Sequence, residues 1–485
     1  MKQTIASLRN RIIAPVVAAA LLTNAPVATA QWRYPHSNAT NSGFFRVDTL
    51  PAYSPHSVPL GFTAPGVNPV IGPDGTVYAG TMDGVIHAYH PDGSAYWTRK
   101  INSEHGGFYG SPIVGADGSI YIVSTIYQDA SPNRVNESFL HKFTPGGGWA
   151  FYKPFPKSAL YPFTDGGETN APPNIWEWRG TEAIVIPVKY QGLGREDVSL
   201  VAFSTNGSLI ARQQVSVEVY DINGGADLVT WAGYCIALNV WNFELGCYLA
   251  WELSGHDLFG FKSPPASVPL AGAGFPMVGV AILQDPFGGP PRIATTDRKH
   301  DKAVYAFSLQ DGFSQIVHTR DITLNYTTPP VQLPDGSTVV GTDKGVLTKT
   351  LLNLLEGPSI PGGFGTLTAA PTRHRDGSIV VVSREGSVTK YGNGFWRTAL
   401  GGQSIASAAA SCTHVFVTAR NGFYTYDAGT MQQVAEYSWI NHGGLSSPVI
   451  GPQGQIYAIV DQYLFVFKGP PTTTSNGCST FPTTP

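Results

Sequence analysis

The chain has 485 residues, of which 55 are glycine and 38 are proline; 13% are charged, 42% apolar and 12% aromatic. Soluble domains average about 25% charged residues and about 12% glycine plus proline, so this composition favours an all-β chain rich in turns and excludes disorder except in short tails. The 30 basic and 33 acidic residues give a net charge of −3, which argues against nucleic acid as a partner.

The N-terminus has the pattern of an export signal. Basic residues precede an apolar run over 12–22, and the small residues at 28–30 provide a cleavage pattern. The apolar run is shorter than the ~20 residues that a membrane-spanning helix needs. We therefore expect a signal peptide over 1–30, a mature chain that begins at Gln31 and does not span a membrane, and a secreted or periplasmic location.

An exported chain can form disulfides, and this one has an even number of cysteines. A hairpin centred on Trp241 places two of them opposite each other and predicts the pairs Cys235–Cys247 and Cys412–Cys478. Four cysteines allow three pairings, so the other two stay open. No spacing of cysteine and histidine indicates a zinc site, and no metal site is expected.

A short motif recurs along the chain and indicates a repeat protein. Each copy begins with a proline; four copies carry Asp-Gly five and six residues later, and three carry a further glycine fifteen residues after the proline. Asp-Gly and Asn-Gly between alternating apolar residues indicate tight hairpin turns. Four short antiparallel strands in each ~40–45 residues are typical of a propeller blade. The copies begin at Pro69, Pro112, Pro330, Pro371 and Pro448.

The repeats predict an all-β fold, an eight-bladed β-propeller of four-stranded antiparallel blades over residues 66–468. The last unit has only three convincing strands, so an N-terminal closing segment, 31–65, is expected to complete it and close the ring. Deletion of 31–50 is then expected to open that blade to solvent. Segment 215–262 is interpreted as an insertion, and 469–485 as a Thr/Pro-rich tail.

Two stretches carry a resemblance to a known superfamily. SPIVGADGSIYIVS (111–124) and GTMDGVIHAYHPDGSAYW (80–97) resemble repeats of the quinoprotein alcohol dehydrogenase-like propellers, whose repeats are of the pyrroloquinoline-quinone type. The resemblance implies this propeller fold. Dehydrogenases of the superfamily hold their quinone with a pair of adjacent cysteines and a calcium site, which no motif here matches. The chain is therefore interpreted as a member of a non-dehydrogenase branch, with neither quinone nor calcium expected.

Gly-Gly connections lead into several predicted inner strands and would lie around the channel mouth. Their acidic and histidine residues form the predicted ligand-binding group, the alternative being an ordinary solvated loop. Three tryptophans near outer strands, Trp97, Trp149 and Trp396, are predicted to pack between blades as core. The predicted binding residues are Glu104, His105, Asp165, Glu168 and His442.

These observations favour a non-catalytic binding or scaffold protein whose partner is a protein, a glycan or a cell-envelope component. The alternative is an enzyme with its site in the propeller funnel, either a quinone-dependent oxidoreductase or a carbohydrate-active enzyme. Fold alone does not decide between them.

Overall fold

The computed structural model describes the chain from residue 32 to residue 468 with gaps, and all the statements below refer to this part. It is all-β, and its only helical element is a 3-10 turn, η1 (Ser103–His105). The described residues are 32–47, 49, 54–64, 66–126, 137–157, 167–169, 171–192, 195–219, 226–227, 238–239, 277–285, 288–297, 303–309, 314–320, 327–345, 347–350, 365–392, 394–439 and 446–468.

The strands of the first half form separate antiparallel sheets in chain order. They are β2 (Val70–Ile71), β3 (Val77–Gly80), β4 (Val85–Tyr89) and β5 (Ala95–Lys100); then β6 (Gly107–Phe108), β7 (Ile113–Val114), β8 (Ile120–Ile126), β9 (Glu137–Phe143) and β10 (Trp149–Pro154); then β11 (Asn174–Trp178), β12 (Thr181–Gly192), β13 (Arg195–Ser204) and β14 (Leu209–Val219); and a separate pair, β15 (Ala226–Asp227) with β16 (Leu238–Asn239).

The second half continues in the same way. Its sheets are β17 (Met277–Leu283), β18 (Arg292–Asp297), β19 (Ala303–Ser308) and β20 (Ser314–Arg320); β21 (Val331–Gln332), β22 (Thr338–Gly341) and β23 (Leu347–Thr350); β24 (Thr372–Arg373), β25 (Ile379–Val382), β26 (Ser387–Gly392) and β27 (Gly394–Ala399); β28 (Ala409–Ala410), β29 (His414–Ala419), β30 (Gly422–Asp427) and β31 (Gln433–Ser438); and β32 (Val449–Ile450), β33 (Ile456–Val460) and β34 (Tyr463–Phe467).

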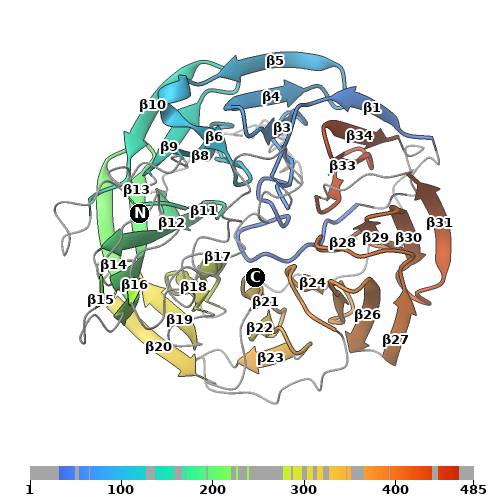
Figure 1. Cartoon of the computed structure of the whole chain (residues 1–485). Coiled ribbons are helices and arrows are strands. Elements are labelled where there is room, and N and C mark those ends of the chain that lie inside the picture. The colour runs from blue at the N-terminus through green and yellow to red at the C-terminus, as the bar shows by residue number, and fades with distance from the viewer. Residues whose placement is uncertain are drawn as a thin grey trace, which may run out of the picture.

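Apart from the β15–β16 pair, these sheets are arranged around a common centre, with the first strand of each near the centre (Figure 1). The sheet formed by β32–β34 has its outermost strand from the other end of the chain. That strand is β1 (His56–Pro59), which pairs antiparallel with β34 from His56 opposite Val466 to Pro59 opposite Tyr463. Residues 31–50, whose deletion was expected to open this sheet, do not supply that strand.

The predicted Asp-Gly turns are confirmed. In each of them the aspartate side chain also accepts hydrogen bonds from the residue two positions later. Asp74 accepts hydrogen bonds from the Thr76 backbone N–H at 3.0 Å and the Thr76 hydroxyl at 2.7 Å. Asp117 binds Ser119 in the same way. The glycine after each aspartate has a positive φ, 84° at Gly75, which only glycine adopts at little cost. Each turn therefore specifies its own hairpin.

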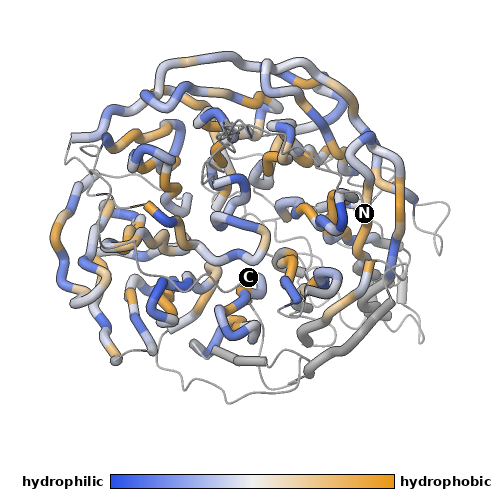
Figure 2. The backbone as a smooth tube through the Cα atoms, turned by 180° about the vertical axis from the view of Figure 1, so that it is seen from behind, coloured by the Kyte–Doolittle hydropathy of each residue, from blue (hydrophilic) through white to orange (hydrophobic). Residues whose placement is uncertain are grey.

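Neighbouring sheets are joined through the last turn of each unit as well as through apolar side chains. A side chain of one sheet donates to a carbonyl in that turn of the next sheet. These bonds run from Tyr457 to Pro91 at 2.7 Å, Trp97 to Pro145 at 2.9 Å, Lys142 to Thr205 at 3.0 Å and Lys390 to Ala428 at 2.7 Å. Apolar residues lie along the strands of these sheets, as the hydropathy view from behind shows (Figure 2), and some strands are continuous apolar runs, such as β25.

The tryptophan prediction holds at two of the three positions. Trp97 lies against Gly147 of the next sheet, where an added Cβ would come within 2.7 Å of the Trp97 ring. The ring centroid of Trp396 lies 5.6 Å from that of Tyr426 in the neighbouring sheet. Trp149 is 40% exposed, so its assignment as core is wrong. Trp149 pairs with Phe143 before the bulge of β10, whereas Trp97 pairs with Ala88 after the equivalent bulge of β5, so the two tryptophans occupy different places in their units.

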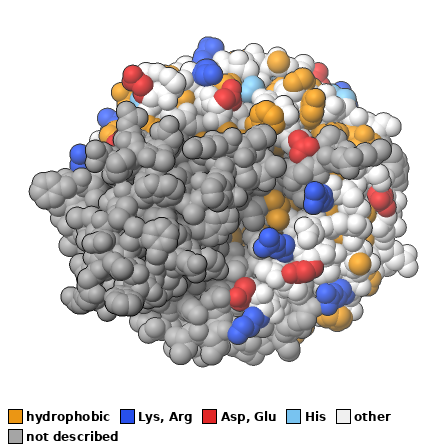
Figure 3. Space-filling model, in the orientation of Figure 1, with side chains coloured by type: hydrophobic (Ala, Val, Ile, Leu, Met, Phe, Trp, Pro, Cys, Tyr) orange, Lys and Arg blue, Asp and Glu red, His pale blue; other side chains and the backbone are white. Residues whose placement is uncertain are grey.

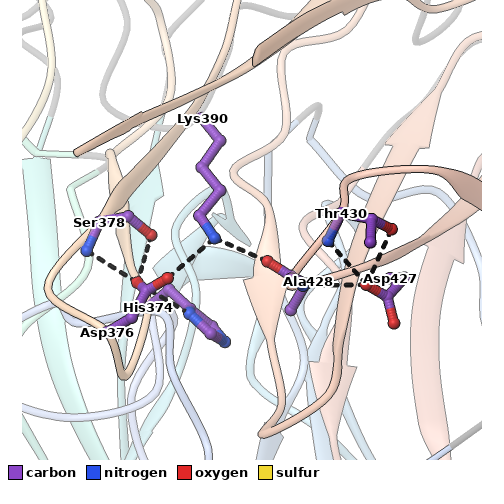
Figure 4. A network of polar contacts seen from close by, with 8 residues as sticks. His374, Asp376, Ser378, Lys390, Asp427, Ala428 and Thr430 are labelled. Carbon is purple, nitrogen blue, oxygen red and sulfur yellow. Dashed lines mark hydrogen bonds and ion pairs between the residues drawn. The ribbon is translucent and has the colours of Figure 1, made fainter. Parts of the chain in front are cut away.

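One junction between sheets carries a network of charged and polar side chains (Figure 4). Asp376 accepts hydrogen bonds from the Ser378 backbone N–H, from Lys390 Nζ at 2.9 Å and from His374 Nδ1 at 3.0 Å. Burial by itself would raise the pKa of Asp376, but the bonds from His374, Ser378 and Lys390 outweigh it and hold the pKa far below its usual value. Lys390 links this network to Ala428 of the next sheet.

Several predictions fall outside the described residues. The signal peptide, the tail and three of the four cysteines belong to that part of the chain, whereas Cys412 is described and buried. The predicted disulfide pairs therefore stay predictions. Within the expected insertion, β14 continues to Val219, which pairs with Arg195.

Candidate functional site

The centre of the molecule contains the N-terminal residues 32–47, which we call the channel segment. Its blue trace crosses the middle of the ring of sheets in Figure 1. The segment forms backbone hydrogen bonds to the innermost strands in chain order. These bonds are Ile71 N–H to Trp32 O (2.8 Å), Val114 to Arg33 (2.9 Å), Ile282 to Ala39 (2.8 Å), Gln332 to Thr40 (3.1 Å), Arg373 to Ser42 (2.8 Å), Ala410 to Gly43 (2.9 Å) and Cys412 to Val47 (3.0 Å).

Side chains fix the path of the channel segment. Trp32 is fully buried, with its ring 6.1 Å from that of Phe45. Asn41 donates from its amide to the carbonyls of Val280 at 3.2 Å and Pro330 at 3.1 Å, which joins two neighbouring sheets. Because these backbone and side-chain hydrogen bonds join the segment to several sheets, the segment is an integral lining of the channel.

His36 is a buried side chain of the channel segment whose protonation state depends on its surroundings. Its Nδ1–H donates to Asn41 O at 2.5 Å, and its ring packs so closely on Gly43 that a Cβ there would lie 2.6 Å away. Burial lowers the pKa of His36 to about 4, although the bond to Asn41 acts in the opposite direction. The ring is therefore neutral at neutral pH.

A cavity of about 140 Å³ remains in the channel beside this segment. It is lined on one side by Tyr34, His36 and Asn41, and on the other by residues that lead into the innermost strands. Drug-sized ligands occupy pockets of roughly 300–1,000 Å³, so this space suits a few water molecules or a very small neutral molecule.

The wall of the cavity carries a chain of hydrogen bonds from sheet to sheet. Ser407 N–H donates to Ser447 Oγ at 3.0 Å, Ser447 N–H to Asn68 Oδ1 at 2.7 Å, and Asn68 N–H to Ser111 Oγ at 2.8 Å. Sequence reasoning missed these residues, although a signal was present. Asn68, Ser111 and Ser447 each stand directly before a repeat proline.

The residues around the cavity do not fit the quinone and calcium ion that the resemblance raises. Calcium takes six to eight oxygen ligands, among them carboxylates, and no Asp or Glu lines this cavity in the described part of the chain. We therefore derive no chemistry through either group.

The three predicted site residues that the structure describes, Glu104, His105 and Glu168, do not line this cavity. Glu104 is exposed, and its carboxylate accepts from Asn102 Nδ2 at 3.3 Å. Glu168 forms a buried ion pair with Lys189 of β12, where the two side chains are 4% and 0% exposed. Asp165 and His442 lie outside the described residues.

His105 belongs to an aromatic cluster at the outer side of the sheet formed by β6–β10. Its ring lies 4.2 Å from Tyr152 and 5.7 Å from Trp149, both in β10, and 5.6 Å from His141 in β9. His105 is buried, and burial lowers its pKa and takes that of His141 to about 3. Both rings are therefore uncharged at neutral pH, and His105 supports the cluster from beneath.

A bulge places two rings of this cluster on the same face of β10. The pairing of β10 with β9 shifts between Trp149 and Phe151, so Trp149 and Tyr152 lie on the same face although they are three residues apart. They are 40% and 46% exposed, with ring centroids 5.6 Å apart. We call this pair the aromatic platform. Tyr96, 47% exposed, is on β5, the outermost strand of the neighbouring sheet.

Charge is sparse on the surface that the structure describes. The space-filling view shows Lys, Arg, Asp and Glu scattered over the described part of one face, with no cluster of one sign (Figure 3). No group of three or more potential metal ligands is found in the described residues. Among the same residues no helix is long and apolar enough to cross a membrane.

Comparisons with known proteins find similar architectures among solved structures. No family model matches the sequence, and no curated protein matches it significantly. Among solved structures, quinohemoprotein alcohol dehydrogenase ADHIIG from Pseudomonas putida HK5 has a TM-score of 0.58 at 11% identity, over 92% of this chain and 81% of that one. The quinohemoprotein alcohol dehydrogenase from Comamonas testosteroni has a TM-score of 0.56 at 11% identity, over 93% and 82%.

Propellers of another kind are also similar. The C-terminal WD40 domain of Sif2 has a TM-score of 0.51 at 10% identity, over 87% of this chain and 99% of that one. At such low identity these likenesses show the fold alone, a β-propeller of antiparallel sheets.

Proposed function

We propose that this chain is an exported, secreted or periplasmic binding or scaffold protein, in a branch of the superfamily without dehydrogenase activity. Its ring would have eight blades, closed by the pairing of β1 with β34. The blade count is supported by the eight sheets of three or more strands in the described residues. Its partner would be a protein, a glycan or another envelope component.

One observation carries the binding function, the aromatic platform. Soluble proteins commonly cover large aromatic rings, and rings held rigidly at a surface contribute contact area at little entropic cost. Trp149 and Tyr152 are held in this way by His105 and His141. The filled channel supports the same function, because the central site that an enzyme of this fold would use is lined by the chain itself.

The test measures co-sedimentation of the purified mature protein with isolated cell-envelope fractions and with insoluble polysaccharides. The double variant Trp149→Ala/Tyr152→Ala removes the platform. Phe395→Ala is the matched control, since Phe395 is 65% exposed on β27, the outermost strand of another sheet. We expect at least one material to retain wild type and control alike, and to retain the double variant at least tenfold more weakly.

Equal retention of all three proteins, or retention of none, would refute the platform as the binding surface. Oxidation of alcohols by protein loaded with pyrroloquinoline quinone and calcium, above the rate of the free cofactor, would support the enzyme instead. Recovery of the full precursor in the cytoplasmic fraction would refute export.

A further inference from the structure

The channel segment has the geometry of a peptide bound by strand addition. The innermost strand of a propeller sheet has one free edge, and here those edges donate in turn to carbonyls of residues 32–47. Around Phe44 the contact is a parallel β-bridge to Ala410, with bonds in both directions at 2.9 and 2.8 Å. Backbone recognition of an extended chain by a free sheet edge is a known mode of peptide binding.

Side chains of the sheets also recognise the segment. The amide of Asn68 donates to Pro35 O at 3.0 Å and that of Asn174 to Ala39 O at 3.1 Å. Backbone bonds supply affinity for any extended chain, whereas these amides and the buried site of Trp32 select a register. The contacts come from sheets far apart in the sequence, so only the assembled channel provides them.

A short link joins the C-terminal end of the channel segment to the rest of the molecule. Residues 48–55 separate it from β1, and Ser54 in this link is exposed. A short tether raises the effective concentration of a bound segment to the millimolar range, which favours the docked state without any additional contact.

We propose that the inner edge of the propeller is a binding site for an extended peptide, and that the chain's own residues 32–47 are its resident ligand. The site recognises an apolar aromatic residue at the start, where Trp32 is buried, and an Asn-x-Gly element at 41–43. Asn41 bridges two sheets in this element, and Gly43 has a φ of 64° and lies against His36. A segment of a second copy of this chain could occupy the same site.

The experiment separates the segment from the ring in the folded protein. A protease recognition sequence inserted after Ser54 allows the link to be cut after folding. We expect the fragment to remain bound through gel filtration, because its contacts are unchanged, and to exchange slowly with a fluorescent synthetic peptide of residues 31–54. Loss of all structure on cutting, or a fragment that never exchanges, would overturn the proposal.

Two substitutions with the same chemistry test the recognition. Asn41→Asp replaces the donor to Val280 O and Pro330 O with a carboxylate, which repels both carbonyls, so peptide affinity should fall at least tenfold. Asn38→Asp keeps the acceptor that its Oδ1 provides to Thr40 and Ser42, within the segment itself, so affinity should stay within about twofold. Equal losses of affinity in the two variant peptides would show that the channel does not recognise the Asn41 side chain.

Discussion

A tryptophan at the inner edge of the sheets is buried, whereas one at the outer edge is exposed to solvent. Trp32 in the channel is fully buried, in a segment whose carbonyls accept hydrogen bonds from the surrounding strands. Trp149 on the outermost strand β10 is 40% exposed and held by histidine and tyrosine rings. The inner edge is satisfied by the chain itself, whereas the outer edge presents aromatic surface.

If the aromatic platform binds a partner as proposed, binding and stability depend on separate parts of the molecule. A change at the inner edge removes contacts that join several sheets, so it should act on the free energy of unfolding. A change at the aromatic platform should act on a partner and leave the fold in place. The predictions below test this separation.

The largest difference is expected between two substitutions of the same kind. Trp32→Ala should lower the free energy of unfolding by about 3–5 kcal/mol, because it leaves a cavity in a packed site. Trp149→Ala should lower it by about 1 kcal/mol or less, since its ring is partly in solvent. Chemical denaturation of both variants measures the two values. Similar losses would break the distinction between the edges.

The second effect depends on pH and comes from His36. Its pKa is about 4 in the folded chain and about 6.5 when unfolded, so between these values the unfolded state binds more protons. Stability from this residue is complete above pH 6.5, falls by about 3 kcal/mol as the pH drops to 4, and changes little below that.

Unfolding measured between pH 7 and pH 4 in wild type and in His36→Asn isolates this contribution. Asparagine keeps a donor near the position of Nδ1 but does not titrate. The variant should be less stable at pH 7 and lose less stability on acidification. A pH dependence identical to that of wild type would show that His36 is not responsible.

The smallest effect on stability is expected between the two edges, at the turns that contain Asp376 and Asp74. Asp376→Asn keeps an acceptor for Ser378 but removes the charge that faces the buried Lys390, and should cost about 1–3 kcal/mol. Asp74→Asn makes the same change at the equivalent turn, where the side chain binds Thr76, and should cost about 0.5 kcal/mol or less. Equal costs would mean that the ion pair contributes nothing.

The sequence by itself predicted the repeating hairpins, because their determinants are local. An aspartate binds the backbone two residues later, and the following glycine accepts a positive φ, so Asp74-Gly75 specifies a turn without help from distant residues. The superfamily resemblance depended on the same local motif.

Only the tertiary structure decided what fills the channel and which aromatic rings face solvent. Asn41 binds carbonyls 239 and 289 residues away, a distance along the chain that no local pattern encodes. His105 was predicted at the channel mouth from its Gly-Gly loop, yet it packs beneath Tyr152, because the bulge in β10 turns Trp149 and Tyr152 to one face. Such contacts exist only once the sheets are assembled, since each depends on the relative position of segments that are far apart in the sequence.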